Sequence, residues 1–410
     1  MTAAAACVAV LLTTAGALAA PPDAQHGKPG KKPRAPHSLR LTQGADGASE
    51  APSLSADGRY AVFTSSASNL VPGDTNGAPD VFLRDLRTGR TQRVSTDAAG
   101  GQSELGATAG AISANGRYAV FVSASADLIP GEVHDVPSVY RRDLRSGEVE
   151  YVGNELGGST RWALHASVSA DGRYVAFASS STVPRPGAGV GVRDMRTGEL
   201  AVQPSCLHRP LTPQLSDDGR ALVYTCYGFP VLQNPPSDVV VADPVTGARR
   251  SLHTTPEGAR GNGRVSQGGI SGDGRYASFT STATDLGPED TNGAGANVFV
   301  RDLRTDTLRI VEAPDPTLST ADGALSGNGR YLLFRAFATE ADAGTWYLRD
   351  LRSGRTRVAI VGADGTPVQA AVAARPLDAR ARAVAFSSAA DDLAPGARSP
   401  GTDAYVRRLP

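Results

Sequence analysis

The sequence predicts an all-β fold, a seven-bladed β-propeller whose blades are four-stranded antiparallel sheets. A nonapeptide of the form Ser-x-Asp-Gly-Arg-Tyr-x-x-Phe recurs along the chain, and a hexapeptide of the form Arg-Asp-Leu-Arg-Thr-Gly follows its copies at similar distances. The two ends of the repeat array each supply part of one further blade. A repeat period of roughly 50–60 residues lies in the range of propeller arrays.

The two motifs divide the chain into units. Copies of the nonapeptide span residues 55–63, 113–121, 169–177, 216–224, 271–279 and 326–334, with a degraded copy at 377–386. Copies of the hexapeptide span residues 84–89, 142–147, 193–198, 242–247, 301–306 and 349–354, and residues 404–409 take its place at the end of the chain.

Each unit contains the four strands of one blade, which we call a to d. Asp-Gly or Asn-Gly is the preferred pair of a two-residue hairpin turn, because both residues need positive φ. In the first unit this turn leads into strand b, Arg59–Phe63, whose large residues on both faces predict burial between neighbouring blades. Strand c is expected at Val81–Asp85, and the turn Arg87–Gly89 leads to strand d at Thr91–Val94.

The chain ends predict how the ring closes. The seventh unit supplies strands a, b and c and then the chain stops, while residues 38–42 precede the first unit and read as the missing strand d. Pairing the two ends removes an exposed sheet edge. A six-bladed ring with a stray half-unit is the alternative.

At this point the repeats resemble those of the TolB-type, WD-like propeller family, which also occur in the propeller domains of some prolyl-oligopeptidase relatives. The resemblance covers residues 38–410 and implies fold more than function. TolB carries an α/β domain ahead of its propeller, whereas here only the short segment 21–37 lies between the N-terminal apolar run and the first strand. Prolyl-peptidase relatives need a hydrolase domain with a Gly-x-Ser-x-Gly elbow, which the sequence lacks.

The N-terminus predicts export. Residues 1–20 form an apolar run that ends in small residues, as in a secretory signal peptide, and residues 21–37 form a Pro-rich basic linker. A retained membrane anchor is the alternative reading of the apolar run. In a secreted or extracytoplasmic chain, Cys206 and Cys226 are a plausible disulfide pair, and closing a loop of that size contributes about 3 kcal/mol.

Composition excludes some classes of partner. Lys and Arg total 41 and Asp and Glu total 41, so no net charge points to nucleic acid, and we expect no nucleic-acid partner. We also expect no integral membrane domain after signal cleavage, and a monomer.

Blade geometry sorts the connections into two sets. The a–b and c–d turns are minimal and share one face, while the b–c and d–a connections are long, varied and share the other. Binding sites favour variable loops on a rigid scaffold. We therefore expect a site on the face of the long loops and at the mouth of the central channel.

The b–c loops of the first and fifth units contain candidate calcium ligands. The first loop offers Asp74, Asn76 and Asp80, and the fifth offers Asp290, Asn292 and Asn297. Ca²⁺ prefers oxygen ligands of this kind from a tight loop with glycine. The alternative is that these side chains cap turns. No cofactor other than calcium is expected.

Two further loops carry single aromatic or histidine side chains: Trp162 and His165 in the third unit, and Tyr227 and Phe229 in the fourth. On the loop face they could stack on a sugar or anchor a peptide; the alternative is packing against the blade tops. The Arg-Asp pair of strand c recurs in five units, so we expect it to be structural, with Asp accepting turn N–H groups and Arg packing between blades.

These observations favour a non-catalytic exported propeller that binds a protein, peptide or glycan through its loop face. The alternative is a propeller enzyme of lyase, glycosidase or lactonase type with a site at the channel mouth. The expected a strands are poor in ionisable groups, which favours binding. A purely structural spacer is a third reading, which the absence of any ligand would support.

Overall fold

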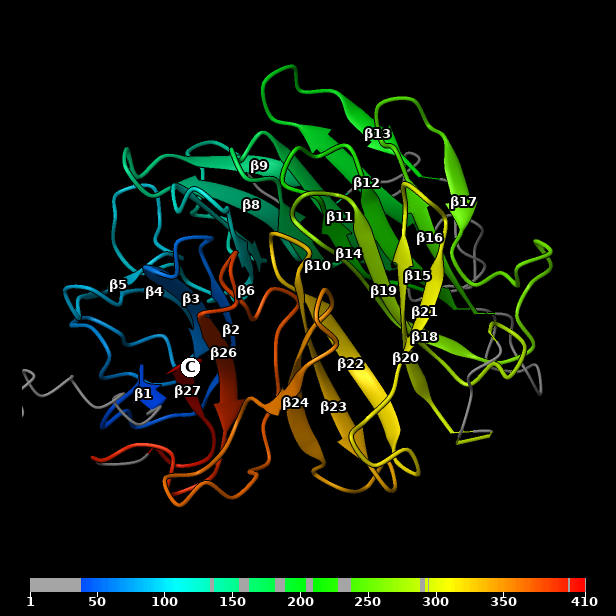
Figure 1. Cartoon of the computed structure of the whole chain (residues 1–410). Coiled ribbons are helices and arrows are strands. Elements are labelled where there is room, and N and C mark those ends of the chain that lie inside the picture. Colours follow the sequence, from blue (N-terminus) through cyan, green and yellow to red (C-terminus); the bar gives the residue numbers. More distant parts are fainter. Residues whose placement is uncertain are drawn as a thin grey trace, which may run out of the picture. The chain divides into compact units, whose positions relative to one another are not determined.

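The computed structural model describes residues 38–132, 136–154, 162–180, 189–203, 209–227, 237–287, 292–293, 295–396 and 399–409. The regular elements in these ranges are all β-strands (Figure 1), and the ranges contain no helix with the length and apolar character to cross a membrane. The predicted signal peptide, 1–20, and linker, 21–37, lie outside them.

Six blades are four-stranded antiparallel sheets of consecutive strands, as predicted. Their strands, in the order a to d, are β2 (Ser49–Leu54), β3 (Tyr60–Ser65), β4 (Asp80–Asp85) and β5 (Thr91–Arg93) in blade 1; β6 (Thr108–Ile112), β7 (Tyr118–Ser123), β8 (Ser138–Asp143) and β9 (Val149–Gly153) in blade 2; β10 (Trp162–Val168), β11 (Tyr174–Ser180), β12 (Gly189–Asp194) and β13 (Leu200–Val202) in blade 3; β14 (Arg209–Leu215), β15 (Leu222–Tyr227), β16 (Asp238–Ala242) and β17 (Arg249–Ser251) in blade 4; β18 (Val265–Ile270), β19 (Tyr276–Ser281), β20 (Asn297–Asp302) and β21 (Leu308–Val311) in blade 5; and β22 (Ser319–Leu325), β23 (Tyr331–Phe337), β24 (Thr345–Asp350) and β25 (Thr356–Val358) in blade 6.

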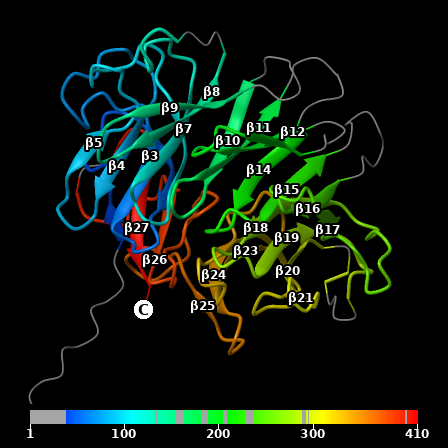
Figure 2. The same ribbon diagram turned by 90° about the horizontal axis from the view of Figure 1, so that it is seen from above.

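Blade 7 joins the two ends of the propeller, as predicted. Strand β1 (Ser38–Arg40) pairs antiparallel with β27 (Asp403–Arg408), which pairs with β26 (Ala383–Ser388). In both views the red β26 and β27 lie beside the blue strands of blade 1 (Figures 1 and 2). The seven-bladed ring is thus confirmed and the six-bladed alternative is wrong.

The inner strand of blade 7 differs from the prediction. The segment from 371 to 377 takes its place but pairs with β26 only through isolated bridges, Ala371 with Ser387 and Leu377 with Val384. Pro376 lies in this segment and has no N–H to donate, so a continuous ladder cannot form there. Its carbonyl still accepts a hydrogen bond from Ala385 N at 2.7 Å.

A ring of backbone hydrogen bonds links neighbouring blades at the a–b turns. Each bond joins residues of two adjacent blades that lie one or two positions after the motif serine, or after Asp378, which takes its place in blade 7. The seven donor and acceptor pairs, at 2.7–3.1 Å, are Ala56 to Ala114, Asn115 to Ala170, Ala170 to Asp217, Asp217 to Gly272, Asp273 to Gly327, Asn328 to Ala379 and Ala379 to Ala56. The repeated motif makes this ring possible. Because every a–b turn has the same length, equivalent backbone groups of neighbouring blades lie at the same level along the propeller axis.

The last residue of the nonapeptide builds the core of each blade. In five blades this buried Phe stacks on an aromatic ring of strand c, with centroids 5.4–5.9 Å apart: Phe63 on Phe82, Phe121 on Tyr140, Phe279 on Phe299, Phe334 on Tyr347 and Phe386 on Tyr405. Such pairs stabilise the blade beyond their burial.

The Arg-Asp pair of strand c is structural, as predicted. In blade 2, Asp143 accepts a hydrogen bond from the turn residue Arg145 N at 2.9 Å and an ion pair from Arg117 at 2.6 Å. The guanidinium of Arg142 donates to the carbonyl oxygen of Val94 in blade 1 at 3.1 Å. Asp143 therefore fixes the c–d turn, and its neighbour Arg142 links blades 1 and 2.

Candidate functional site

The inner strands carry a bulge in each of the six complete blades. The register shifts lie between Glu50 and Ser53, Ala109 and Ala111, Ala163 and His165, Leu211 and Gln214, Ser266 and Gly268, and Ala321 and Ala324. Bulges next to a channel re-aim side chains and are frequent beside functional sites.

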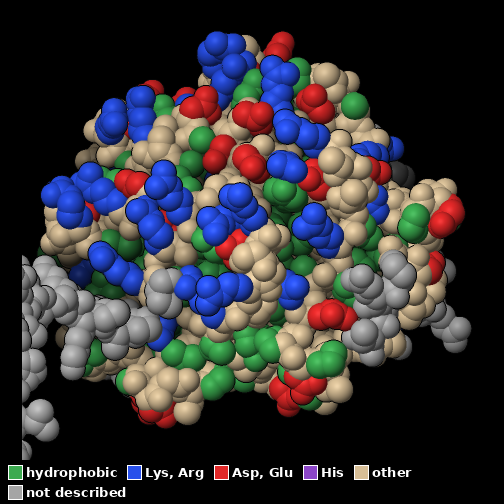
Figure 3. Space-filling model, viewed as in Figure 1, with side chains coloured by type: hydrophobic (Ala, Val, Ile, Leu, Met, Phe, Trp, Pro, Cys, Tyr) green, Lys and Arg blue, Asp and Glu red, His purple; other side chains and the backbone are tan. Residues whose placement is uncertain are grey.

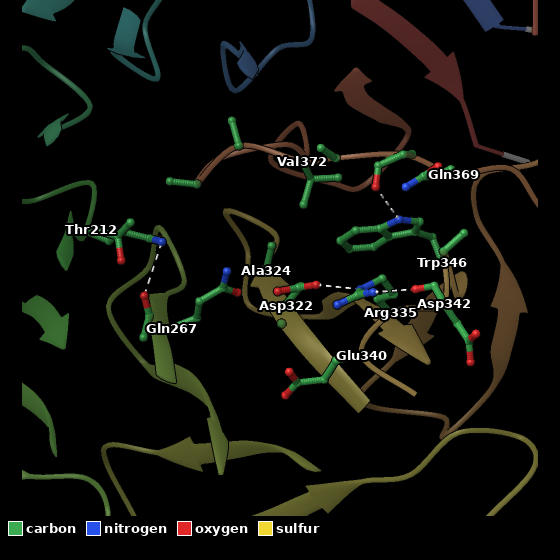
Figure 4. A pocket seen from close by; sticks show the side chains of 18 of the residues that line it. Thr212, Gln267, Asp322, Ala324, Arg335, Glu340, Asp342, Trp346, Gln369 and Val372 are labelled. Carbon is green, nitrogen blue, oxygen red and sulfur yellow. Dashed lines mark hydrogen bonds and ion pairs between the residues drawn. The ribbon is translucent and has the colours of Figure 1, made fainter. Parts of the chain in front are cut away.

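Four of these bulges place a residue other than glycine at positive φ. Ala51 has φ 51°, Thr212 43°, Gln267 42° and Asp322 61°. A residue with a Cβ costs energy in this region, of the order of 1–3 kcal/mol in sparsely populated conformations. Thr212, Gln267 and Asp322 come from three consecutive blades and line one cavity at the loop-face end of the channel (Figure 4).

The cavity has a volume of about 380 Å³, within the range of small-molecule sites. It lies among blades 4 to 7 and is bounded by the b–c loop of blade 6 and the irregular inner segment of blade 7. Its described lining residues are Thr212, Gln214, Gln267, Gly268, Asp322, Gly323, Ala324, Arg335, Glu340, Ala341, Asp342, Ala343, Trp346, Gln369, Ala370, Ala371, Val372, Ala373 and Ala374.

The charges of the cavity are predominantly negative. Asp322 Oδ2 accepts from Arg335 Nε at 2.8 Å, and Arg335 Nη1 donates to the carbonyl oxygen of Asp342 at 3.1 Å. Figure 4 shows this pair facing the cavity, with Glu340 extending near its edge. Arg335 is the only base among the described lining residues, against the carboxylates of Asp322, Glu340 and Asp342. Its guanidinium is already bound, whereas Glu340 is exposed and has no partner among the described residues.

The opposite wall is apolar. Trp346 is 2% exposed, and its Nε1 donates to the carbonyl oxygen of Ala370 at 3.1 Å. The ring therefore forms a fixed wall of the cavity, together with Val372 and the alanines around it (Figure 4). Two blades fix the position of this ring, because Trp346 belongs to β24 of blade 6 and Ala370 directly precedes the inner segment of blade 7.

The other end of the channel is closed by a side chain. Arg375 of blade 7 donates from Nη2 to Asp217 Oδ1 at 2.9 Å and to the carbonyl oxygen of Leu215 at 3.0 Å, both in blade 4. A cavity of about 20 Å³ lies beside Arg375 at this end of the channel, much smaller than the cavity at the loop face.

The predicted aromatic site residues are not brought into this cavity within the described residues. His165 is exposed beside the bulge of β10 and is not among the described residues that line the cavity. The backbones of Trp162 and Tyr227 lie in β10 and β15, but their side chains, and Phe229 altogether, are outside the described residues. Their role as ligand contacts stays a prediction.

Only one of the two cysteines of the predicted disulfide lies in the described residues. Cys226 is disulfide-bonded. Cys206 lies outside the described residues, so the pairing of these two cysteines stays a prediction.

The predicted calcium ligands of blade 1 have partners within the protein. Arg93 forms ion pairs with Asp74 at 3.1 Å and with Asp80 at 3.3 Å. Asn76 Nδ2 donates to the carbonyl oxygen of Ser103 at 2.9 Å, and its Oδ1 accepts from Ala78 N at 2.9 Å. Burial raises the pKa of Asp80, and the hydrogen bond from Ser95 opposes this shift. These contacts match the turn-capping alternative.

In blade 5, Asn292 and Asn297 pair with each other: Asn292 Nδ2 donates to Asn297 Oδ1 at 3.0 Å, and Asn297 Nδ2 donates to Asn292 Oδ1 at 2.9 Å. Asp290 lies outside the described residues. Within the described ranges, no group of three or more His, Cys, Asp or Glu side chains could hold a metal ion. Calcium binding stays a prediction.

Sequence reasoning missed the residues that build the cavity, notably Asp322, Arg335, Glu340 and Trp346. One signal was available: the segment Ser319–Leu325 contains Asp322-Gly323 within an expected inner strand. An Asp-Gly pair away from the hairpin turn indicates a bulge.

Comparisons with known proteins agree with the fold. An oligogalacturonate lyase in complex with manganese and the oligogalacturonate lyase of Vibrio parahaemolyticus each match with a TM-score of 0.59 and 14% identity, over 91% of this chain and 93% of theirs. At this identity the likeness shows the fold alone.

TolB from Acinetobacter baumannii matches with a TM-score of 0.40 and 16% identity, over 76% of this chain and 63% of its own, which is too weak to carry an argument. No protein-family model matches the chain, and no curated protein matches it. The propeller is confirmed, while the TolB-type family stays a resemblance.

Proposed function

We propose that this protein is an exported, non-catalytic carbohydrate-binding propeller that holds an uncharged, hydroxyl-rich end of a glycan in the cavity at its channel mouth. The observation that carries the proposal is the cavity itself. It places carboxylates and amides of three bulged inner strands opposite the apolar wall of Trp346.

The lining suits hydroxyl groups. A carboxylate accepts hydrogen bonds from sugar hydroxyls, and an amide both donates and accepts. Asp322, Glu340, Gln267 and Gln369 offer these groups around one cavity. Val372 and the alanines beside it give the accessible apolar wall that complements the C–H face of a sugar ring, and the buried Trp346 indole behind them holds this wall in place before binding.

The charge balance selects the class of sugar. Carboxylates outnumber the single described guanidinium, and that guanidinium is bound to Asp322. An acidic sugar would bring a further negative charge next to Asp322 and Glu340, which costs energy in a partly desolvated cavity. A neutral glycan avoids this repulsion, so we expect the cavity to reject uronic acids.

The enzyme alternative has less support. The lyase activity named for two structural neighbours belongs to those proteins. The neutral glycan that we expect in this cavity differs from their substrate, which is made of galacturonate.

Calcium at the blade 1 loop would require Asp74 and Asp80 to leave Arg93. A melting temperature that rises with calcium and falls with chelator, and does neither in Asp74→Ala, would establish that ion site.

The test is a calorimetric titration with neutral oligosaccharides and with oligogalacturonate of the same length. We expect binding of at least one neutral glycan, and Glu340→Gln or Asp322→Asn to weaken it about tenfold, because each loses a charged hydrogen bond. Asn tolerates the positive φ of position 322. The matched control is Glu104→Gln, an exposed glutamate of the same face outside the cavity. Equal binding by all variants would refute the cavity as the binding site. Detection of a cleaved product by mass spectrometry would refute the non-catalytic function and favour the enzyme alternative.

A further inference from the structure

The chain has no net charge, but its turn face and its loop face carry charges of opposite sign. The a–b and c–d turns, which together form the turn face, carry exposed or half-exposed arginines in every blade: Arg59, Arg87, Arg90, Arg117, Arg145, Arg173, Arg196, Arg220, Arg275, Arg304, Arg330, Arg352, Arg355, Arg382 and Arg408. The b–c and d–a loops carry mainly carboxylates, among them Asp46, Asp97, Glu104, Asp127, Glu257, Asp285, Asp315, Glu340, Asp364 and Asp391. In Figure 3, Lys and Arg side chains gather over the upper and central part of the view.

The arginines of the turn face fall into two kinds. The first, such as Arg59, is held by its blade: it forms an ion pair with Asp85 at 2.8 Å, and its guanidinium lies 4.6 Å from the centre of the Tyr60 ring. Blades 2, 3, 5 and 6 repeat this arrangement. These arginines are already neutralised and positioned.

The second kind lies two residues after the strand c Asp and presents its guanidinium to solvent. Its backbone N–H is bound by that Asp at 2.9–3.0 Å, so its main chain is fixed. Its side chain is exposed and makes no hydrogen bond or ion pair within the described ranges. The members are Arg87, Arg145, Arg196, Arg304 and Arg352.

Two grooves between blades bring both kinds together. The groove between blades 1 and 2, of about 340 Å³, is lined by Arg59, Arg90, Arg117 and Arg145. The groove between blades 5 and 6, of about 440 Å³, is lined by Arg275, Arg309, Arg330 and Arg352. The repeat builds the same site twice: Arg59, Arg117 and Arg145 correspond to Arg275, Arg330 and Arg352.

Unmatched positive charge remains in both grooves. The described carboxylates among the lining residues are Asp57 and Asp85 in the first groove and Asp273 and Asp302 in the second. Arg90 and Arg145 in the first, and Arg309 and Arg352 in the second, have no partner among the described residues. A planar guanidinium recognises a carboxylate or sulfate through two parallel hydrogen bonds.

We propose that the turn face binds an acidic polysaccharide, whose regularly spaced anionic groups enter these repeated grooves. Two equivalent subsites on one ring suit a chain that carries the same charge at intervals, since the second contact is then intramolecular. This ligand differs from the neutral glycan proposed for the loop face.

Other polyanions fit the turn face less well. Single-stranded nucleic acid is bound by aromatic side chains on which bases stack, but the tyrosines of both grooves, Tyr60 and Tyr276, lie under guanidiniums. A membrane surface needs contiguous apolar side chains near the charges. The large exposed hydrophobics in the described ranges are scattered: Leu39, Leu105, Val202, Val245 and Val358.

The test measures binding of the full chain to immobilised polygalacturonate, with dextran as the uncharged control and with duplex DNA and phosphatidylglycerol vesicles as competing classes. We expect polygalacturonate to bind most tightly and to bind more weakly as salt rises. The double variant Arg145→Gln, Arg352→Gln should weaken binding about tenfold or more. Both side chains are exposed and unpaired, so the variant should unfold at the wild-type temperature.

Two controls assign the effect to the turn face. Arg264→Gln, an exposed arginine on the opposite face, and Glu104→Gln, an exposed glutamate of that face outside the cavity, should leave polygalacturonate binding unchanged. The proposal would be overturned if polygalacturonate did not bind, or if the double variant bound it as tightly as the wild type. Equal binding of DNA or vesicles would overturn it as well. Self-association at low salt that the double variant abolishes, without polygalacturonate binding, would instead assign the turn face to a second copy of the chain.

Discussion

Arg375 in blade 7 donates a hydrogen bond to Asp217 in blade 4, at 2.9 Å, across the axis of the propeller. These blades are not neighbours in the ring, so no repeated contact connects them. Arg375 Nη2 also donates to the carbonyl oxygen of Leu215 at 3.0 Å. These contacts place the Arg375 side chain across the channel at the end opposite the cavity.

We expect Arg375→Ala to lower the free energy of unfolding by about 1–2 kcal/mol. The ion pair is only partly exposed, with 18% and 33% of the two side chains accessible, and a backbone carbonyl loses its donor. Denaturant unfolding measures the change. Arg220→Ala, an exposed arginine in the neighbouring turn, should change stability by less than about 0.5 kcal/mol; an equally small effect at position 375 would show that the cross-channel contact stabilises nothing.

The closure of the ring depends on a buried ion pair. Arg40 of β1 lies 3.2 Å from Asp403 of β27, both side chains are 1% exposed, and Asp403 also accepts from Thr42 Oγ1 at 2.7 Å. Removing one partner leaves an uncompensated buried charge, which costs about 3–5 kcal/mol. We therefore expect Arg40→Met to melt far below the wild type in a calorimetric scan.

Arg408→Met, at the exposed end of the partner strand β27, is the control. If Arg40→Met melted at the same temperature as this control, the N-terminal strand would not hold the ring.

Acid should weaken the ion pairs that recur at the a–b turns. The guanidinium of Arg173 holds the pKa of Asp194 at about 2, below its usual 3.8. A depressed folded pKa gives stability that is present above the unfolded pKa and lost as pH falls through the folded one. The wild type should have a higher unfolding free energy than Arg173→Gln above pH 4, and this difference should shrink towards pH 2. Denaturant unfolding at pH 6, 4 and 2.5 gives this difference, and a constant value across the series would refute the assignment.

His253 should produce a separate loss of stability at milder pH. Burial lowers its pKa from 6.5 to about 4, and its Nε2 contacts Ser281 Oγ at 2.8 Å. The neutral form is favoured in the folded chain, so the unfolded chain takes up a proton first. Stability is present above pH 6.5 and should fall by about 3 kcal/mol between pH 6.5 and 4. In His253→Gln this part of the pH profile should be flat, and an unchanged slope would exclude His253 as the cause.

Most of the fold was predictable from the sequence because each copy of the repeat contains the same residues for the same local hydrogen bonds. Ser55 Oγ donates to Asp57 Oδ1 at 2.6 Å and accepts from Tyr60 N at 3.0 Å, and the other motif copies repeat these bonds. A pattern of this kind fixes each hairpin without long-range information. The closing strand was predictable for a related reason, since the last unit lacked a strand that residues 38–42 could supply.

The cavity could not be predicted in the same way. Asp322, Arg335 and Trp346 occur once each at their blade positions, and they meet only because a bulge in β22 turns Asp322 towards Arg335. Arg375 and Asp217 are separated by 158 residues; Asp217 occupies the variable second position of its nonapeptide copy, and Arg375 lies outside both repeated motifs. Contacts across a ring depend on its closed geometry, which the local pattern does not encode.

The most direct measurement of the proposed function is a two-dimensional ¹⁵N spectrum of the labelled protein during titration with neutral oligosaccharides. The chain has 2 tryptophans, Trp162 and Trp346, so Trp162→Phe identifies the Trp346 indole N–H signal. That N–H donates to Ala370 in the cavity wall. Binding in the cavity should shift the Trp346 signal in wild type and, at the same ligand concentration, much less in Glu340→Gln. A bound glycan that leaves the Trp346 signal in place would contradict the cavity as the binding site.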